Sequence, residues 1–245
     1  EYQKYHGRSG HYLVKLFKMI QLNWKYRICH SELDDSLAKL RMPEYSSIQL
    51  PSQRELIDEL KNYDIISFDI FDTLIFRCVS EPRDVFRLLE SEWHILHFAE
   101  KRVQAEAKAR ERMGEATIYD IYEILSKELS IDIEQAIEKE FDIENKVCFA
   151  NPYMKFIFDE LNENKQVVLT SDMYLTKQML QELLCKCGYS VKEDQIFVSC
   201  ELGVGKENGR LQNLVSQAFG CSKTYIHVGD NRNNDILGSK KAGWD

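Results

Sequence analysis

Short apolar runs alternate with longer amphipathic segments over the second half of the chain. Residues 167–170, 196–199 and 224–228 are runs of β-branched and aromatic residues, and residues 65–70 form a similar run further upstream. Runs of this length and composition predict buried strands. The segments between them have helical periodicity, and they predict helices at about 153–163, 175–188, 207–219 and 234–242.

This order of elements predicts the fold class. Strands that alternate with helices are joined by right-handed crossovers, which give a parallel sheet covered by helices on both faces. We therefore expect an α/β fold with a doubly wound parallel, Rossmann-like sheet.

Residues 77–150 have helical periodicity throughout and contain no run of the strand type. A helix is expected to open at Ser80-Glu81-Pro82 and to run on through the alanine-rich residues 104–113. Thr117 and Asp132 have the spacing of N-terminal caps for two further helices. We interpret this segment as an all-α cap inserted into a catalytic core made of residues 61–76 and 151–245.

Residues 1–60 precede this pattern and are expected to form a helical extension. Pro51 followed by Ser52-Gln53-Arg54-Glu55 is a capping box, which predicts a helix to about Leu60. Further upstream, apolar residues at helical spacing with lysines between them predict a basic amphipathic helix. The apolar stripe consists of Leu13, Leu16, Phe17, Ile20 and Trp24.

An apolar stripe of this kind has to be covered by something. Packing on the catalytic domain is the first alternative, because contact within one chain needs no partner. An adjoining domain or a partner protein is the second. A membrane surface attracted by the flanking lysines and arginines is the third.

Both ends of the sequence indicate a piece of a longer protein. There is no initiating methionine, and the chain stops at Asp245 directly after the residues KKAGW. That segment is expected to lead into a further strand, so we expect the last strand of the sheet to lie outside this sequence.

Composition excludes several classes of protein. The 245 residues carry a net charge of −8, although residues 1–30 contain six Lys or Arg and one acidic residue. The acidic remainder argues against broad nucleic-acid binding. The seven cysteines form no Cys-x-x-Cys pair, and neither a signal peptide nor a segment able to span a bilayer is present. These features predict a cytoplasmic protein with reduced thiols.

Four segments place reactive side chains just beyond short strand-like or glycine-rich stretches. They read IISFDIFDTL at residues 65–74, VVLTSD at 167–172, GVGKENGR at 203–210 and HVGDNRNNDILG at 227–238. A parallel α/β sheet builds its sites at the carboxyl ends of its strands. The four segments supply a carboxylate nucleophile, a hydroxyl group, a lysine and a carboxylate pair, which together suit phosphoryl transfer with a magnesium ion.

In this order the four motifs resemble those of the haloacid dehalogenase-like hydrolase superfamily, most of whose members are magnesium-dependent phosphatases. The resemblance covers the chain from Asn62 to the C-terminus, including a cap between the first two motifs. It implies that Asp69 is a nucleophile that forms an aspartyl-phosphate. It also implies that Thr73 forms hydrogen bonds within the nucleophile loop and holds its shape.

The second and third motifs are expected to hold the phosphoryl group. Ser171 and the backbone amide of Asp172 would donate hydrogen bonds to a phosphoryl oxygen. Thr170, one residue earlier, is the alternative hydroxyl. Lys206, between two glycines, would neutralise charge on the phosphoryl group and restrain Asp69.

The fourth motif is expected to complete a largely hydrated Mg²⁺ site. Its ligands would be Asp69, the backbone carbonyl of Phe71, Asp230 and, directly or through water, Asp235. These carboxylates would repel one another without a cation. His227 is expected to be a core or edge histidine.

The sequence departs from the usual phosphatase pattern at Phe71. Phosphatases of the superfamily carry a second aspartate at this position, as general acid and then base, whereas here Asp72 follows one place later. Neighbouring side chains point in different directions, so Asp72 need not reach the same place. Losing a general acid typically costs about 10²–10⁴-fold in rate. Dehalogenases of the superfamily also lack the second aspartate, which keeps a carbon-centred displacement as a further alternative.

The favoured hypothesis is therefore a Mg²⁺-dependent phosphatase acting on a small phosphorylated metabolite. The alternative is a weakly active or inactive module of the same fold that positions a partner, such as a glycosyltransferase domain of surface-polysaccharide synthesis. Relatives with a similar FDIFDTL motif accompany such enzymes. Arg77 and Arg83, near the cap junction, are expected to be solvated, with contact to an anionic substrate as the alternative.

Overall fold

The computed structural model describes residues 51–245, which form one compact unit. Residues 1–50, with the predicted amphipathic stripe, lie outside the described residues. Helix α4, Gln53–Leu60, begins at the predicted capping box and packs against helix α9, Pro152–Asn164. It therefore belongs to the compact unit that begins at Pro51, one helix earlier than the boundary expected after residue 60.

The central sheet has four parallel strands in the order β5-β4-β1-β6. Its members are β1 (Ile65–Phe68), β4 (Gln166–Ser171), β5 (Ile196–Val198) and β6 (Tyr225–Val228). All four lie where the apolar runs predict them, and the predicted α/β class is confirmed. At the outer edge of β6, the backbone of Asp245 accepts a hydrogen bond from His227 and donates one to Tyr225, at 2.8 and 3.1 Å.

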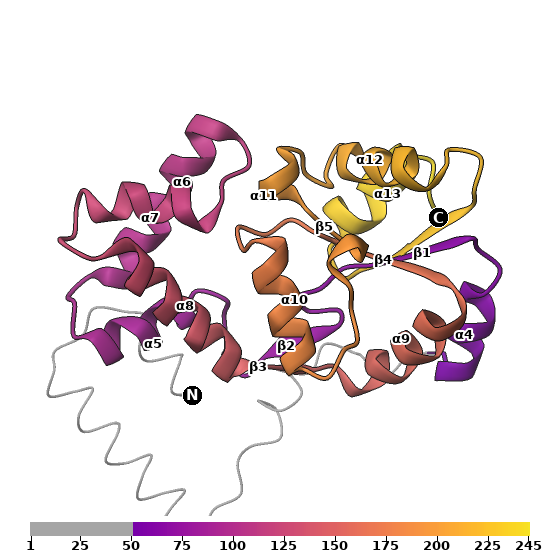
Figure 1. Ribbon diagram of the computed structural model, residues 1–245, viewed down its shortest axis with the longest axis horizontal. Helices are drawn as coiled ribbons and strands as arrows, with labels where there is room; N and C mark the ends of the chain where they lie inside the picture. The colour runs from indigo at the N-terminus through magenta and orange to yellow at the C-terminus, as the bar shows by residue number, and fades with distance from the viewer. Residues whose placement is uncertain (1–50) are drawn as a thin grey trace, which may run out of the picture. The chain divides into compact units, whose positions relative to one another are not determined.

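Alternate residues of the strands face opposite sides of the sheet, as the twofold period of a strand requires. Ile66 and Phe68 face α4, α9 and α10 (Lys177–Lys186), whereas Ile65 packs with Trp244 and α12 (Arg210–Phe219). Helices thus cover both faces, as Figure 1 shows. Shorter helical segments complete the core: Glu193–Gln195, α11 (Ser199–Leu202), the π-helical turn Arg232–Leu237 and α13 (Gly238–Lys241).

The predicted cap, residues 77–150, forms four helices, which are grouped beside the sheet in Figure 1. Two short antiparallel strands, β2 and β3, connect this cap to the core, and neither has a counterpart in the sequence prediction. The capping residues Thr117 and Asp132 begin helices as predicted. The elements are β2 (Ile75–Arg77), α5 (Asp84–Trp93), α6 (Phe98–Met113), α7 (Ile118–Ser126), α8 (Ile133–Val147) and β3 (Cys148–Ala150).

The prediction of one long helix at the start of the cap is wrong, because the chain breaks between α5 and α6. His94 and His97 adopt left-handed conformations with φ of 54° and 62°. The break turns Phe98 into the core, where its ring lies edge-on to Trp93 at 5.8 Å. The side chain of Glu90 accepts a hydrogen bond from the backbone of Ala99, which replaces a missing helical partner.

A buried ion pair holds the cap together and connects it to the core. Arg102 donates two hydrogen bonds of 2.8 Å to Glu140, and both side chains are fully buried. Tyr122 donates to the same carboxylate at 2.7 Å. The Arg102 guanidinium also lies 4.6 Å from the ring of Tyr174, which follows the second motif. Breaking such a pair typically costs about 3–5 kcal/mol, so the cap should keep this arrangement.

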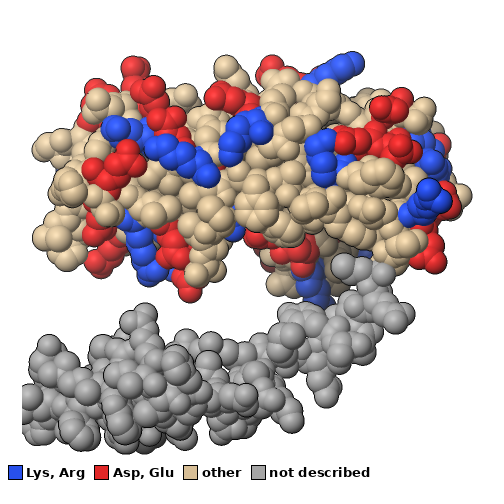
Figure 2. Space-filling model, turned by 90° about the horizontal axis from the view of Figure 1, so that it is seen from below, with Lys and Arg blue, Asp and Glu red and all other residues tan. Residues whose placement is uncertain are grey.

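The exterior is of mixed charge. Figure 2 shows acidic and basic side chains interspersed over the face of residues 51–245 that it displays. Within these residues no helix is long and apolar enough to cross a membrane, and the six cysteines are free thiols. The expectations of a cytoplasmic location and of no nucleic-acid partner stay predictions.

Candidate active site

The carboxyl ends of β1, β4 and β6 meet at one cavity of about 530 Å³. Because these strands are neighbours in the sheet, the loops that follow them are brought together from distant parts of the sequence. The core side of the cavity carries almost all of the predicted chemistry. Its polar lining residues are Asp69, Asp72, Ser171, Asp172, Lys206, Asp230, Asn231, Asn234 and Asp235.

Lys206 lies between two carboxylates at the base of the cavity. Its Nζ donates to Asp69 Oδ1 at 2.6 Å and to Asp235 Oδ1 at 2.5 Å, and all three side chains are buried. Burial alone would lower the pKa of Lys206, but the two carboxylates outweigh it and raise the pKa. The lysine is therefore a fixed positive charge next to Asp69.

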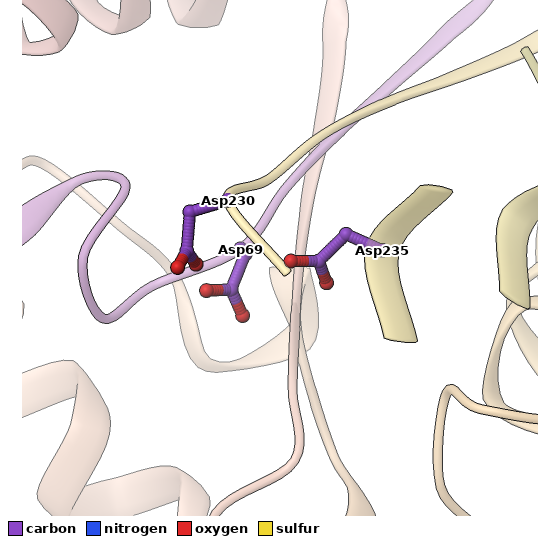
Figure 3. Close-up of side chains that lie close together, drawn as sticks. All are labelled: Asp69, Asp230 and Asp235. Carbon is purple, nitrogen blue, oxygen red and sulfur yellow. The ribbon is translucent and has the colours of Figure 1, made fainter. Parts of the chain in front are cut away.

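Asp69, Asp230 and Asp235 converge, with one oxygen of each lying within 4.8 Å of the others. Figure 3 shows their carboxylates gathered in one region. Burial raises the pKa of Asp69 to about 6, and the charge of Asp235 adds to the rise while Lys206 opposes it. Burial likewise raises the pKa of Asp230, with contributions from Asp235 and Asp72. Burial is thus the main cause of both raised pKa values, and the negative charge of Asp235 adds to it.

Asp235 is held in its charged form. Burial alone would raise the pKa of Asp235, but a hydrogen bond from His227 and the charge of Lys206 hold it well below its usual range. Asn231 supplies a third donor, from its backbone amide to Asp235 Oδ2 at 2.8 Å. Gly229 permits this packing, since a Cβ there would lie 2.4 Å from the Asp235 carboxyl group.

A chain of hydrogen bonds behind the site orients Asp235. His227 Nε2 lies 3.1 Å from Asp235 Oδ1, and its Nδ1 lies 2.9 Å from the hydroxyl of Ser67. Because an ionised carboxylate only accepts, Nε2 donates, and burial lowers the pKa of His227, which favours the neutral ring. Ser67 in turn lies 3.2 Å from the Thr170 hydroxyl. His227 is a core residue, as predicted, but it also positions Asp235.

The structure distinguishes between the two candidate hydroxyls of the second motif. Thr170 faces Ser67 on the far side of the strand, whereas Ser171 lines the cavity and its hydroxyl makes no hydrogen bond within residues 51–245. Ser171 is therefore the hydroxyl available to a bound anion. The Asp172 carboxylate accepts from the Lys206 backbone amide at 2.9 Å and from Asn234 at 3.0 Å. It therefore joins motifs two, three and four.

The loop of the first motif turns back on itself after Asp69. Asp72 adopts a left-handed conformation, with φ of 58°, and its backbone amide donates to Ile75 O at 2.8 Å. The side chains of Phe71 and Asp72 diverge: the Phe71 ring lies under Arg77, whereas the charge of Asp72 acts on Asp230. Both residues line the cavity.

Thr73 does not make the hydrogen bond expected of it. Its buried hydroxyl has no partner within the described part of the chain. Its backbone carbonyl instead accepts a hydrogen bond from the side chain of Asn151 at 2.9 Å, which connects the loop of the first motif to the start of α9. The main chain, and not the hydroxyl, anchors this loop.

The donor set fits a magnesium ion. Three carboxylates offer the hard oxygen ligands that Mg²⁺ prefers. The Phe71 carbonyl accepts no hydrogen bond within residues 51–245, so it is available as a further ligand. Both oxygens of Asp235 already accept hydrogen bonds, which leaves Asp69 and Asp230 as the carboxylates better placed to bind a metal directly.

The cap supplies the opposite wall of the cavity. Phe86, Val103 and Ala107 provide its apolar part, and Arg83 and Arg110 provide positive charge. Arg110 is paired with Glu106 and Glu115, whereas Arg83 is exposed and forms no ion pair among residues 51–245.

Several solved structures have a similar fold. YfnB from Bacillus subtilis, described as a HAD-hydrolase bound to magnesium, is 17% identical over 75% of this chain and 86% of its own, with a TM-score of 0.51. A 2-haloacid dehalogenase from Pseudomonas syringae is 16% identical over 74% of this chain and 84% of its own, with a TM-score of 0.52. The chain has the haloacid dehalogenase-like fold.

A third structure is covalently bound to chloropropionic acid. This L-2-haloacid dehalogenase from Xanthobacter autotrophicus is 17% identical over 74% of this chain and 75% of its own, with a TM-score of 0.51. No family model matches the sequence, and no curated protein matches it. Similarity at this level shows the haloacid dehalogenase-like fold and leaves the reaction to be argued from the site.

The raised pKa of Asp69 predicts a pH-dependent metal affinity. A proton on Asp69 competes with Mg²⁺, so the affinity should rise about tenfold per pH unit up to about pH 6 and level off above it. Calorimetric titration of the protein with Mg²⁺ between pH 5 and pH 8 measures this. Equal affinities at pH 5 and pH 7 would contradict the assignment of Asp69 as a ligand.

Proposed function

We propose that this protein is a Mg²⁺-dependent phosphatase that acts on small phosphorylated metabolites through an aspartyl-phosphate on Asp69. The observation that carries the proposal is the convergence of Asp69, Asp230 and Asp235 within 4.8 Å, with Lys206 2.6 Å from Asp69. Carboxylates so close together favour a cation, and a phosphoryl group is the substrate that needs both that cation and a lysine.

Each residue has a defined part in the proposed reaction. An Asp69 oxygen attacks phosphorus, and Lys206 and Ser171 hold the phosphoryl oxygens as charge moves onto them. The bound Mg²⁺ would neutralise charge between Asp69 and the phosphoryl group. Asp172 fixes the position of Lys206 through its backbone, and His227 fixes Asp235. Water then releases phosphate and restores Asp69.

The cavity sets the size of the substrate. A volume of about 530 Å³ is within the usual range of small-molecule sites. The apolar patch of Phe86, Val103 and Ala107, with Arg83 beside it, favours a compact compound that carries some apolar surface and further negative charge. A phosphorylated macromolecule fits this enclosure poorly.

A carbon-centred displacement is a weaker explanation of the same site. Replacing a halide by carboxylate attack requires no divalent cation, so it gives no reason for Asp230 and Asp235 to lie beside Asp69. Phe71 favours a second candidate function, a weakly active module that positions a partner. The two candidates differ in turnover, which is directly measurable.

The deciding experiment is Mg²⁺-dependent turnover of a panel of phosphorylated compounds. We expect phosphate release with Mg²⁺ and none in excess EDTA. Asp230→Asn should weaken Mg²⁺ binding by at least about tenfold, since the substitution removes a charged ligand from a hydrated site. Calorimetry measures the affinity, and Asp194→Asn, at an exposed position outside the cavity, is the matched control. Unchanged affinity in Asp230→Asn would remove Asp230 from the site.

A further inference from the structure

None of the carboxyl groups that line the cavity is well placed to donate a proton to a leaving group. Asp69 and Asp230 face the metal position, and Asp172 and Asp235 accept hydrogen bonds from neighbouring donors. Among the cavity carboxylates that leaves Glu106 and Asp72. Glu106 is paired with Arg102 and Arg110, and the charge of Asp72 acts on Asp230.

Attack by Asp69 directs the leaving group toward the cap. Nucleophile and leaving oxygen lie on opposite sides of phosphorus in an in-line displacement. Asp69, Lys206 and Asp235 occupy the sheet side of the cavity, so the leaving oxygen points away from them. Besides Lys206, the positively charged side chains that line the cavity are Arg77, Arg83 and Arg110.

Of these three arginines, Arg77 is the one that the structure holds rigidly beside the nucleophile loop. Its guanidinium lies 4.0 Å from the centre of the Phe71 ring, and the arginine side chain is only 8% exposed. Its Nε and Nη2 donate to Glu144 at 2.9 and 3.1 Å. Its Nη1 has no hydrogen-bond partner within residues 51–245, although the residue lines the cavity.

The backbone fixes Arg77 relative to Asp69. The nucleophile loop closes on β2 through hydrogen bonds from Asp72 to Ile75 and from Ile75 to Ile70, at 2.8 and 3.0 Å. Arg77 is the last residue of β2, which pairs with β3. A donor held by stacking, an ion pair and a hairpin needs little reorganisation when charge develops next to it.

We propose that Arg77 donates a hydrogen bond through Nη1 to the leaving oxygen, and that Phe71 is the platform that holds it there. The inference rests on the proposed function and names its substrate class. An arginine stabilises a departing anion but keeps its own proton. The substrates are therefore phosphoryl compounds whose leaving group departs as a stable anion, such as acyl phosphates, phosphoanhydrides and enol or aryl phosphates.

The reaction balances without a protein acid. In the first step the bond between Asp69 and phosphorus forms, the bond to the leaving oxygen breaks, and the electron pair stays on that oxygen. In the second step water attacks phosphorus and the electron pair of the breaking bond returns to Asp69. Both protons of the water remain on the released phosphate.

The test compares wild type with Arg77→Gln on a series of aryl phosphates of graded leaving-group acidity, together with acetyl phosphate. Arg77→Gln should lower kcat/KM by about 10²-fold for the most basic leaving group, the scale for loss of one charge-stabilising donor. The loss for acetyl phosphate should be much smaller. Arg77→Lys keeps the charge but not the planar fork, and should give the same trend with smaller losses.

Glu144→Gln is the matched control, because it alters the other half of the ion pair and leaves Arg77 in place. We expect it to keep the wild-type dependence on the leaving group. If the pair is only a clamp between β2 and α8, then Arg77→Gln and Glu144→Gln will lose activity by one common factor across the series, and the inference is overturned. Thermal melting identifies any variant that is unfolded.

Failure of this inference is distinguishable from failure of the proposed function. Turnover with a uniform effect of Arg77→Gln rejects the role of Arg77 alone. If the wild-type protein hydrolyses none of the compounds and acetyl phosphate does not phosphorylate Asp69, the proposed phosphatase function itself is rejected.

Discussion

Asp69→Asn is expected to abolish phosphate release, with a loss of about 10⁴-fold or more, the scale seen when a covalent nucleophile is removed. The amide is nearly isosteric and still accepts a hydrogen bond from Lys206, so the fold should persist. An amide oxygen, however, is a poor nucleophile toward phosphorus. Phosphate release from acetyl phosphate with excess Mg²⁺ measures the effect. Mass spectrometry after rapid quenching should find the phosphoryl adduct in wild type and not in the variant.

Asp72→Asn is the informative comparison, since Asp72 lies three residues away in the same loop. Its charge acts on Asp230 and it is exposed, so its loss should affect metal binding more than chemistry. An inactive Asp72→Asn variant with normal Mg²⁺ affinity would show that Asp72 acts as the general acid that is missing at Phe71. If the Asp69→Asn variant keeps its turnover, Asp69 is not the nucleophile.

The elements that local sequence determines are those that were predicted correctly. Ser52, Thr117 and Asp132 each begin a helix because a side-chain oxygen accepts a backbone N–H within three residues, an interaction readable from spacing alone. The four strands of the sheet are similarly marked by their apolar runs. The break at His94 has no such signal, because the burial of Phe98 against Trp93 decides it.

The residues of the candidate site likewise fall into those that local sequence predicts and those that depend on distant contacts. Residues just beyond strand ends, such as Asp69 and Asp230, were predictable because the sheet brings strand ends together. The expectation that Arg77 is solvated is wrong, because its side chain is 8% exposed and pairs with Glu144. His227 is in the core as expected, but its contacts with Ser67 and Asp235 were not foreseen. A pairing across 67 or 160 residues leaves no periodic trace in one sequence.

At Phe71 the sequence and the structure give complementary information. The sequence marks it as the position where a carboxylate is missing, and the structure shows a ring that supports a cation 4.0 Å away. The aromatic residue therefore does more than delete an acid. In the reaction proposed above, the Phe71 ring takes the place of a proton donor and supports the arginine that stabilises the leaving anion.

Lys206→Met is expected to be the most destabilising single change in the site. Methionine has a similar length but no charge, so Asp69 and Asp235 would face each other with no buried cation between them. Removing one partner of a buried pair typically costs about 3–5 kcal/mol of unfolding free energy. Mg²⁺ should restore more stability to the variant than it adds to wild type, because it replaces the missing positive charge.

Urea unfolding in EDTA and in excess Mg²⁺ measures both effects. Lys240→Met is the matched control: it removes one lysine from an exposed position with no ion pair among residues 51–245, and should change stability by about 0.5 kcal/mol or less. Equal losses in the two variants would show that Lys206 contributes no more than a surface charge. If Lys206→Met loses much of its unfolding free energy and Mg²⁺ does not reduce that loss, then Mg²⁺ does not bind next to the position of Lys206. The clustering of Asp69, Asp230 and Asp235 would then need an explanation other than a metal site.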